Sequence, residues 1–223
     1  MQSPDMSSLT SLDNQLFLAV NELAGDSAWL HGAVVSFAEY GVILFGIALV
    51  VGVLYSRRHT ARTSAAAVWA GLGTLLALAV NQPIGNAIHE ARPYTTYPHA
   101  LVLVTKTSDF SFPSDHAVMA GAVAAGLFLV SRRLGLVAAA LAFAMAAARV
   151  YVGAHYPWDV VAGLALGAGV VLLGWLVAGP TLTRLVSSLR TTRLRPLLVA
   201  GSGADRPAAF GQHPTPSTLG RST

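Results

Sequence analysis

Five long apolar stretches, separated by short polar connectors, constrain this chain more than any other feature of its sequence. Most are close to the roughly 20 residues that an α-helix needs to cross a bilayer. Hydrophobic residues make up 54% of the chain and charged residues only 11%, so lipid is the expected solvent. We predict an all-α, polytopic transmembrane helix bundle of five spans, with residues 27–40 as the candidate for a sixth. The five stretches are 37–55, 63–84, 116–130, 134–151 and 160–178.

Cationic residues lie in alternate connectors, at 57–62, at 131–133 and beyond residue 183. Because cytoplasmic connectors of membrane proteins are enriched in Lys and Arg, we expect these three on the cytoplasmic side. The loop at 85–114 and the turn at 153–158 then face outward, and the C-terminus faces the cytoplasm. No Lys or Arg precedes the first connector, so no secretory signal peptide is predicted. The pattern predicts a multi-pass plasma-membrane protein, and the scattered arginines do not indicate nucleic-acid binding.

The composition divides the chain into three parts. Residues 1–31 carry several acids among scattered apolar side chains, which is typical of a helix lying in the membrane interface. Residues 32–180 hold the predicted spans. Residues 181–223 are rich in Arg, Pro, Ser, Thr and Gly and cannot bury a core of their own. For this last part we expect a basic, largely disordered cytoplasmic tail.

Three polar clusters fall at the predicted outer ends of the spans. Burial of polar groups at membrane depth costs free energy, so such clusters usually mark a functional site. The first is Arg92-Pro93, the second covers residues 112–116, and the third covers residues 149–159. The guanidinium group of arginine can bind two phosphate oxygens at once, and it keeps its charge at any working pH. Two arginines, two histidines, a serine and a carboxylate together suit phosphoryl transfer. The side chains singled out are Arg92, Ser114, His116, Arg149, His155 and Asp159.

The second and third clusters indicate a role for each polar residue. Ser114 occupies an N-cap position, so the N–H groups that follow it can face an anion at a helix start. Pro157 fits the first turn of a helix, which puts Asp159 one turn beyond His155. A carboxylate there can hold one ring nitrogen and leave the other free to attack phosphorus. His116 then serves as proton donor to the leaving oxygen.

These clusters resemble the three motifs of the type 2 phosphatidic acid phosphatase superfamily, which read Lys-x6-Arg-Pro, Pro-Ser-Gly-His and Ser-Arg-x5-His-x3-Asp. The resemblance covers residues 81–170. It implies a membrane phosphatase in which His155 is a nucleophile that forms a phosphohistidine. Asp159 would orient that histidine, and His116 would protonate the leaving group. The residues that would hold the phosphoryl oxygens are Arg92, Ser114 and Arg149.

Three positions depart from the family motifs. Gly85 stands where the family has lysine, and Lys106 is the candidate replacement for that phosphate contact. Ala148 replaces the serine before Arg149. Asp115 replaces the glycine of Pro-Ser-Gly-His, and its carboxylate would repel a phosphate unless it faces away or pairs with an arginine. The Pro-Ser-Asp-His version resembles that of bacterial undecaprenyl-diphosphate phosphatases of the bacitracin-resistance type.

The resemblance leads us to expect removal of the terminal phosphate of undecaprenyl diphosphate on the outer face, which recycles a carrier lipid for cell-wall synthesis. The alternative is a phosphatase for phosphatidic acid, phosphatidylglycerol phosphate or another polyprenyl phosphate. A more remote alternative is a non-catalytic lipid-phosphate binder or transporter, in which Gly85 and Asp115 mark a decayed site. His89 and Glu90, close to Arg92 in sequence, are accessory candidates. With no cysteine and no metal-ligand pattern, we expect no metal or other cofactor; the sequence leaves the oligomeric state open.

Overall fold

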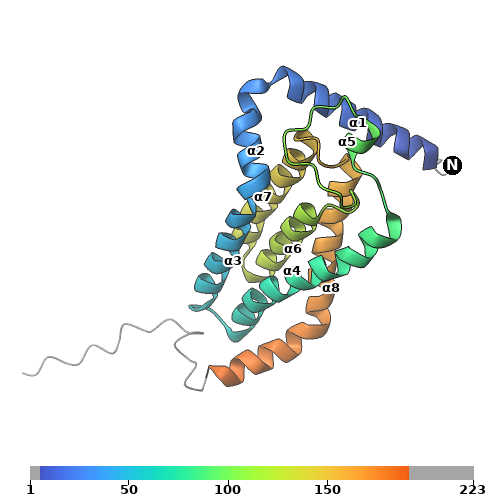
Figure 1. The fold of residues 1–223 in the computed structure, drawn as a ribbon. Helices are drawn as coiled ribbons and strands as arrows, with labels where there is room; N and C mark the ends of the chain where they lie inside the picture. The colour runs from blue at the N-terminus through green and yellow to red at the C-terminus, as the bar shows by residue number, and fades with distance from the viewer. Residues whose placement is uncertain (1–5, 191–223) are drawn as a thin grey trace, which may run out of the picture.

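The computed structural model describes residues 6–190 of the 223-residue chain, and most of the predicted tail lies outside these residues. Every regular element in the described range is helical (Figure 1), which confirms the predicted all-α class. The elements are α1 (Met6–Asp26), the short 3-10 helix η1 (Ala28–Leu30), α2 (His31–Tyr40), α3 (Val42–Ser56), α4 (Ala61–Ile88), α5 (Pro93–Thr96), α6 (Asp115–Val130), α7 (Arg132–Tyr151) and α8 (Pro157–Leu189).

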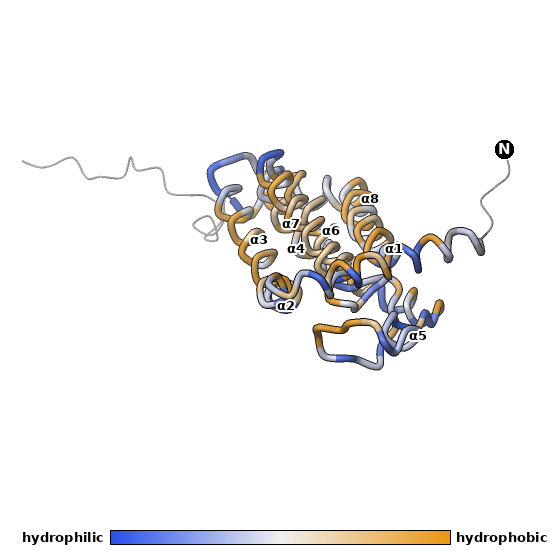
Figure 2. Tube along the Cα trace, turned by 90° about the horizontal axis from the view of Figure 1, so that it is seen from above, coloured by the Kyte–Doolittle hydropathy of each residue, from blue (hydrophilic) through white to orange (hydrophobic). Residues whose placement is uncertain are grey.

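Four of the predicted spans lie within single helices, α4, α6, α7 and α8. In the described residues, three helical segments are long and apolar enough to cross a bilayer. They are α7, α8, and the segment formed by α4 and α5 together. Helix α6 is apolar but has only 16 residues. Figure 2 shows that the bundle helices are mostly hydrophobic and that the hydrophilic stretches lie in the segments between them. The chain is therefore a membrane protein, and the count of five spans stays a prediction.

The first predicted span, 37–55, is not one straight helix. It is divided between α2 and α3 at Gly41, and the two parts of the segment are bent by 52°. A Cβ atom on Gly41 would collide with the carbonyl oxygen of Phe37, so only glycine fits at this position. The candidate sixth span, 27–40, forms the first arm of this bent pair. The two arms reach the length and composition of a span only when they are taken together.

Helix α8 is longer than the sequence predicts. The predicted span ends at residue 178, but the helix continues through Pro180 to Leu189. A proline removes one hydrogen bond and bends a helix, and membrane helices tolerate it where neighbouring groups satisfy the freed carbonyl. Figure 1 shows this bend in the lower half of α8. The expected boundary at residue 180 therefore falls inside a helix.

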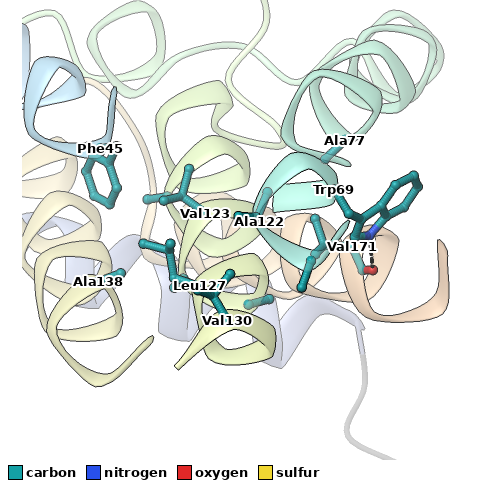
Figure 3. Close-up of a cluster of buried hydrophobic side chains, with 14 of the residues drawn as sticks. Phe45, Trp69, Ala77, Ala122, Val123, Leu127, Val130, Ala138 and Val171 are labelled. Atoms are coloured by element: carbon teal, nitrogen blue, oxygen red, sulfur yellow. Dashed lines mark hydrogen bonds between the residues drawn. The ribbon is translucent and has the colours of Figure 1, made fainter. Parts of the chain in front are cut away.

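Helix α6 lies at the centre of the bundle and packs against α3, α4, α7 and α8. Figure 3 shows its buried side chains, such as Val123 and Leu127, between the neighbouring helices. Small residues bring α8 very close to α6: a Cβ on Gly163 would lie 2.8 Å from the carbonyl oxygen of Ser114, and one on Gly167 would collide with that of Val118. This close contact aligns the first turns of α6 and α8, which carry the predicted site residues.

Helix α1 lies across the end of the bundle that holds α5 (Figure 1). The Asn21 side chain forms two hydrogen bonds with the backbone of Leu101, at 2.8 and 2.9 Å. The Asp13 carboxylate accepts a hydrogen bond of 2.9 Å from the backbone N–H of Trp158 in the first turn of α8. Helix α1 thus ties the long 97–114 loop and the start of α8 together at one end of the molecule.

Candidate active site

The structure brings the predicted principal residues to the same end of the bundle. Four of them, Arg92, His116, Arg149 and His155, line one cavity of about 340 Å³. They come from four separate places, the N-cap of α5, the first turn of α6, the last turn of α7 and the α7–α8 connector. Residues up to 63 positions apart in sequence therefore meet around one space, as the separation of Arg92 and His155 illustrates.

The ring of His155 is 2% exposed and is held at both nitrogens. Its Nδ1 lies 2.9 Å from the carbonyl oxygen of Ser111. A carbonyl only accepts hydrogen bonds, so Nδ1 must carry the proton and Nε2 must carry the free lone pair. That Nε2 lies 3.2 Å from Nη1 of Arg92, which can only donate. The hydrogen-bond partners thus assign the tautomer with an unprotonated Nε2 beside an arginine.

Burial lowers the pKa of His155 below its ordinary value. The nearby carboxylate of Asp159 opposes this shift, and the positive charges of Arg149 and Arg92 add to it. Desolvation disfavours the charged imidazolium, and two guanidinium groups disfavour it further. The ring is therefore neutral at neutral pH, which a nucleophilic nitrogen requires.

Asp159 is completely buried, and its carboxylate lies between Ser111, the start of α8 and the His155 ring. Its Oδ2 accepts hydrogen bonds from the Ser111 hydroxyl at 2.5 Å and from the Tyr156 N–H at 2.8 Å. Its distance to Nδ1 of His155 is 3.5 Å, longer than the bond from Nδ1 to the Ser111 carbonyl. The sequence argument placed the carboxylate directly on the ring. The structure keeps Asp159 within 3.5 Å of the ring and adds the Ser111 carbonyl as a shorter contact, while Asp159 also holds Ser111 and the start of α8.

The two arginines differ in how their donors are used. Arg92 donates from Nη1 to the carbonyl oxygen of Ala154 at 3.0 Å and forms an ion pair of 2.8 Å with Asp109 through Nη2. Arg149 is also buried, but its Nε has no hydrogen-bond partner in the part of the chain that the structure describes. A buried guanidinium with unused donors beside a cavity is suited to an anionic ligand.

The start of α6 contributes both backbone and side-chain groups. Ser114 is the N-cap of α6, as predicted, but its hydroxyl is fully buried and has no partner among residues 6–190. Its N–H donates to the carbonyl oxygen of Asp159 at 3.2 Å, which joins the two helix starts. His116, in the first turn of α6, is half-buried and lines the cavity.

Asp115, the unusual residue of the second motif, is exposed at the edge of the same cavity. Its Oδ1 accepts hydrogen bonds from the side-chain amides of Asn81 at 2.7 Å and Gln82 at 3.1 Å. The carboxylate is therefore held by two neutral donors on α4, and not by an arginine, the partner that the sequence argument considered.

Of the accessory candidates, Asp115 lines this cavity, whereas Glu90, His89 and Lys106 do not. Glu90 lines a separate cavity of about 510 Å³ with Asp13 and Trp158. His89 packs edge-on against Phe110 with ring centroids 4.5 Å apart. The Nζ of Lys106 lies 5.6 Å from the ring centre of Tyr94. Closeness to Arg92 in sequence did not determine the direction of these side chains.

Gly85 occupies a position with little room for a side chain. A Cβ there would lie 3.3 Å from the carbonyl oxygen of Phe112. Sequence reasoning missed two contact residues, Ser111 and Asp109. Both belong to the polar 104–114 loop, in which several other polar side chains were equally plausible candidates. Their only sequence signal is that they lie just before the second motif.

Comparison with known proteins agrees with this geometry. A family model, the PAP2 superfamily, matches residues 66–184. A protein of Bacillus licheniformis named bacitracin transport permease protein BcrC is 29% identical over 160 residues, covering 72% of this chain and 77% of that protein. The undecaprenyl-diphosphatase BcrC of Bacillus subtilis is 25% identical over 169 residues, covering 74% and 82%.

A solved structure has the same fold. It is the crystal structure of a transmembrane PAP2-type phosphatidylglycerolphosphate phosphatase from Bacillus subtilis, with a TM-score of 0.53 and 22% identity. The match covers 83% of this chain and 90% of that one. The family match spans more than half of the chain and contains all of the residues that line the cavity except Glu39. The chain therefore belongs to the PAP2 superfamily of lipid phosphatases.

Proposed function

We propose that this lipid phosphatase removes the terminal phosphate of undecaprenyl diphosphate through a phosphohistidine on His155. The observation that carries the proposal is the ring of His155, with Nδ1 bonded to the Ser111 carbonyl and Nε2 next to Arg92. An unprotonated nitrogen beside a guanidinium fork suits attack on a phosphorus whose oxygens that fork binds. The Pro-Ser-Asp-His sequence at residues 113–116 and the similarity to undecaprenyl-diphosphatase BcrC support the choice of substrate.

In the proposed first step, Nε2 of His155 attacks the terminal phosphorus and the bond from phosphorus to the bridging oxygen breaks. His116 gives its proton to that oxygen, so the lipid leaves as a monophosphate. Arg92 and Arg149 stabilise the charge on the phosphoryl oxygens. Ser114, with its unpartnered hydroxyl, and the N–H groups at the start of α6 are additional donors.

In the proposed second step, water attacks the phosphohistidine and the bond from nitrogen to phosphorus breaks. His116, now unprotonated, accepts a proton from the water, and inorganic phosphate leaves. Asp159 and Ser111 keep the ring in the same tautomer for both steps. Both histidines return to their starting protonation states, so no further reactant is needed.

The substrate assay compares three lipids at equal concentration in detergent: undecaprenyl diphosphate, undecaprenyl phosphate and phosphatidylglycerol phosphate. We expect phosphate release to be fastest with the diphosphate, and none from His155→Ala. A faster reaction with either monoester would assign the enzyme to the alternative substrate class. Absence of release from all three would refute the substrate proposal.

The phosphohistidine is tested by rapid quenching with substrate labelled in its terminal phosphate. A phosphorus–nitrogen bond is labile in acid and stable in base, so we expect a protein-bound label with that behaviour. The label should be missing from His155→Ala. A burst of free phosphate without any protein-bound label would contradict the covalent step.

We also propose that the site faces the extracytoplasmic side, because the arginine-rich connectors lie at the opposite ends of the helices. The chain has no cysteine, so single cysteines can be introduced without a background. Thr105 and Arg58 are both exposed, one in the loop at the site and the other in the α3–α4 connector. A membrane-impermeant thiol reagent applied to intact cells should label Thr105→Cys and not Arg58→Cys. The reverse pattern would place the site in the cytoplasm.

A further inference from the structure

The anion-binding edge of Arg92 is occupied by the protein itself. Nη2 donates to Oδ2 of Asp109 at 2.8 Å, and Nε donates to the backbone oxygen of the same residue at 3.3 Å. These two donors form the guanidinium edge that matches a pair of phosphate oxygens. The remaining nitrogen, Nη1, contacts Ala154 and His155. A phosphate that binds both Nη2 and Nε of Arg92 must therefore displace Asp109 from them.

The two partners of this ion pair are not equally free to move. The Arg92 side chain is 8% exposed, whereas that of Asp109 is 58% exposed. Among the described residues, no carboxylate contacts the Nε of Arg149, which lines the same cavity. The site thus has one arginine that is open and one that is covered, and the covering group lies toward solvent.

A small network holds the carboxylate over Arg92. The Thr107 hydroxyl donates to Oδ1 of Asp109. The Tyr94 hydroxyl donates to the Thr107 carbonyl at 2.9 Å, and the Thr107 N–H donates to the Tyr94 oxygen at 3.0 Å. Partial burial raises the pKa of Asp109, but the bonds from Thr107 and Arg92 outweigh it and keep this pKa below its usual range. The group over Arg92 is therefore an anion at neutral pH.

We propose that Asp109 is a specificity-determining residue that competes with the ligand's phosphate for Arg92 and turns toward solvent when a sufficiently charged phosphate binds. The proposal rests on the proposed function, in which Arg92 binds phosphoryl oxygens. A terminal phosphate brings more negative charge and more acceptor oxygens than a carboxylate, so it can displace Asp109 from Nη2 and Nε of Arg92. Weakly charged anions cannot, and the carboxylate excludes them from the nucleophile.

The competing explanation is that Asp109 only positions Arg92 and stays in place during the reaction. The two explanations predict opposite signs. If Asp109 competes with the ligand, its neutral replacement binds phosphate more tightly. If Asp109 only positions the arginine, its replacement loosens Arg92 and binds phosphate more weakly.

The test measures binding of inorganic phosphate and orthovanadate to the full-length protein in detergent, by thermal stabilisation at increasing anion concentration. A partly exposed ion pair contributes up to about 1 kcal/mol, which corresponds to about a fivefold change in affinity. We therefore expect Asp109→Asn to bind either anion about three- to fivefold more tightly than the wild type. The matched control is Asp115→Asn, which removes one negative charge from the same cavity without uncovering an arginine.

Asp115→Asn should change affinity less than twofold, because the Asp115 carboxylate is exposed and is bonded to Asn81 and Gln82, so that its loss releases no arginine. An equal gain in both variants would mean a general charge effect and would overturn the proposal, as would weaker binding by Asp109→Asn. Thr107→Val removes the hydroxyl that holds Asp109 and keeps the charge, so we expect a smaller gain in the same direction. It provides the test if Asp109→Asn does not fold, and unchanged or weaker binding by Thr107→Val would then overturn the proposal.

This experiment separates the inference from the proposed function, because anion binding needs no turnover. If the wild type cleaves no lipid but Asp109→Asn still binds phosphate more tightly, the proposed substrate is wrong and the competition by Asp109 stands. If the wild type cleaves undecaprenyl diphosphate and Asp109→Asn does not gain affinity, the function stands and the competition is wrong.

Discussion

Replacing Ser111 with alanine tests how His155 is oriented. The Ser111 hydroxyl donates to Oδ2 of Asp159 at 2.5 Å, and both side chains are fully buried. The substitution removes this donor but keeps the backbone carbonyl that accepts the proton of His155 Nδ1. The change therefore affects the support of the carboxylate while the direct contact to the nucleophile stays.

The expected size follows from the partners that remain. Asp159 keeps one donor to Oδ2, the Tyr156 N–H, and its Oδ1 has no partner in the described residues. A hydrogen bond to a charged group is worth about 1.5–3 kcal/mol. Since each 1.4 kcal/mol at the transition state is about tenfold in rate, we expect kcat to fall about 10- to 100-fold. KM should change little, because the cavity arginines are untouched.

The assay is phosphate release from a lipid substrate over a range of concentrations, with Ser108→Ala as the matched control. Ser108 is exposed in the same loop and contributes nothing to the contacts of Asp159. We expect Ser108→Ala to match the wild type in both kcat and KM. If a folded Ser111→Ala enzyme keeps kcat within about twofold of the wild type, the argument that Ser111 positions the catalytic ring is wrong.

Four further results are expected. His155→Ala should lose at least about 10³-fold in phosphate release, whereas His99→Ala, an exposed histidine, should keep wild-type activity. Burial lowers the pKa of His155, so the proposed nucleophile becomes protonated only as pH falls below the ordinary value of about 6.5; a rate that, as the pH is lowered from neutral, is already halved before that value is reached would contradict this. Gly167→Ala should lower the melting temperature, because overpacking costs about 1–3 kcal/mol, whereas Gly169→Ala should not, because its Cβ would meet nothing within 4 Å. Arg149→Lys keeps the charge and loses the fork, so vanadate inhibition should weaken about tenfold; unchanged inhibition would remove Arg149 from the phosphate site.

Much of the fold was predictable because membrane helices leave a strong sequence pattern. Four apolar runs correspond to α4, α6, α7 and α8, and Pro157 begins α8 as expected. The bend at Gly41 was not predicted, because one charged residue, Glu39, and one glycine do not by themselves divide an apolar run. The passage of α8 through Pro180 was missed because the usual rule, that proline ends a helix, is weaker in membrane helices.

The principal site residues could be chosen from sequence because charged groups are scarce in an apolar chain. Their convergence around one cavity depends on packing, above all on the close contact of α6 with α8. Ser111 and Asp109 could not be chosen, because their roles depend on how an irregular loop folds back onto Arg92 and Asp159. Glu90, chosen for its closeness to Arg92 in sequence, lines a separate cavity, because distance along the chain does not determine which side of the loop a residue faces.

The bonds of α1 have a consequence for the order in which the protein is made. The carboxylate of Asp13 meets a backbone group 145 positions later, and Asn21 meets one 80 positions later. At a synthesis rate of about 5–20 residues per second, α1 waits on the order of ten seconds for its last partner. Until the connector before α8 and the first turn of α8 have been synthesised, the nascent chain lacks His155 and Asp159. With His155 as the proposed nucleophile, we expect hydrolytic activity only after this last segment of the domain has been made, and none in chains that stop before it.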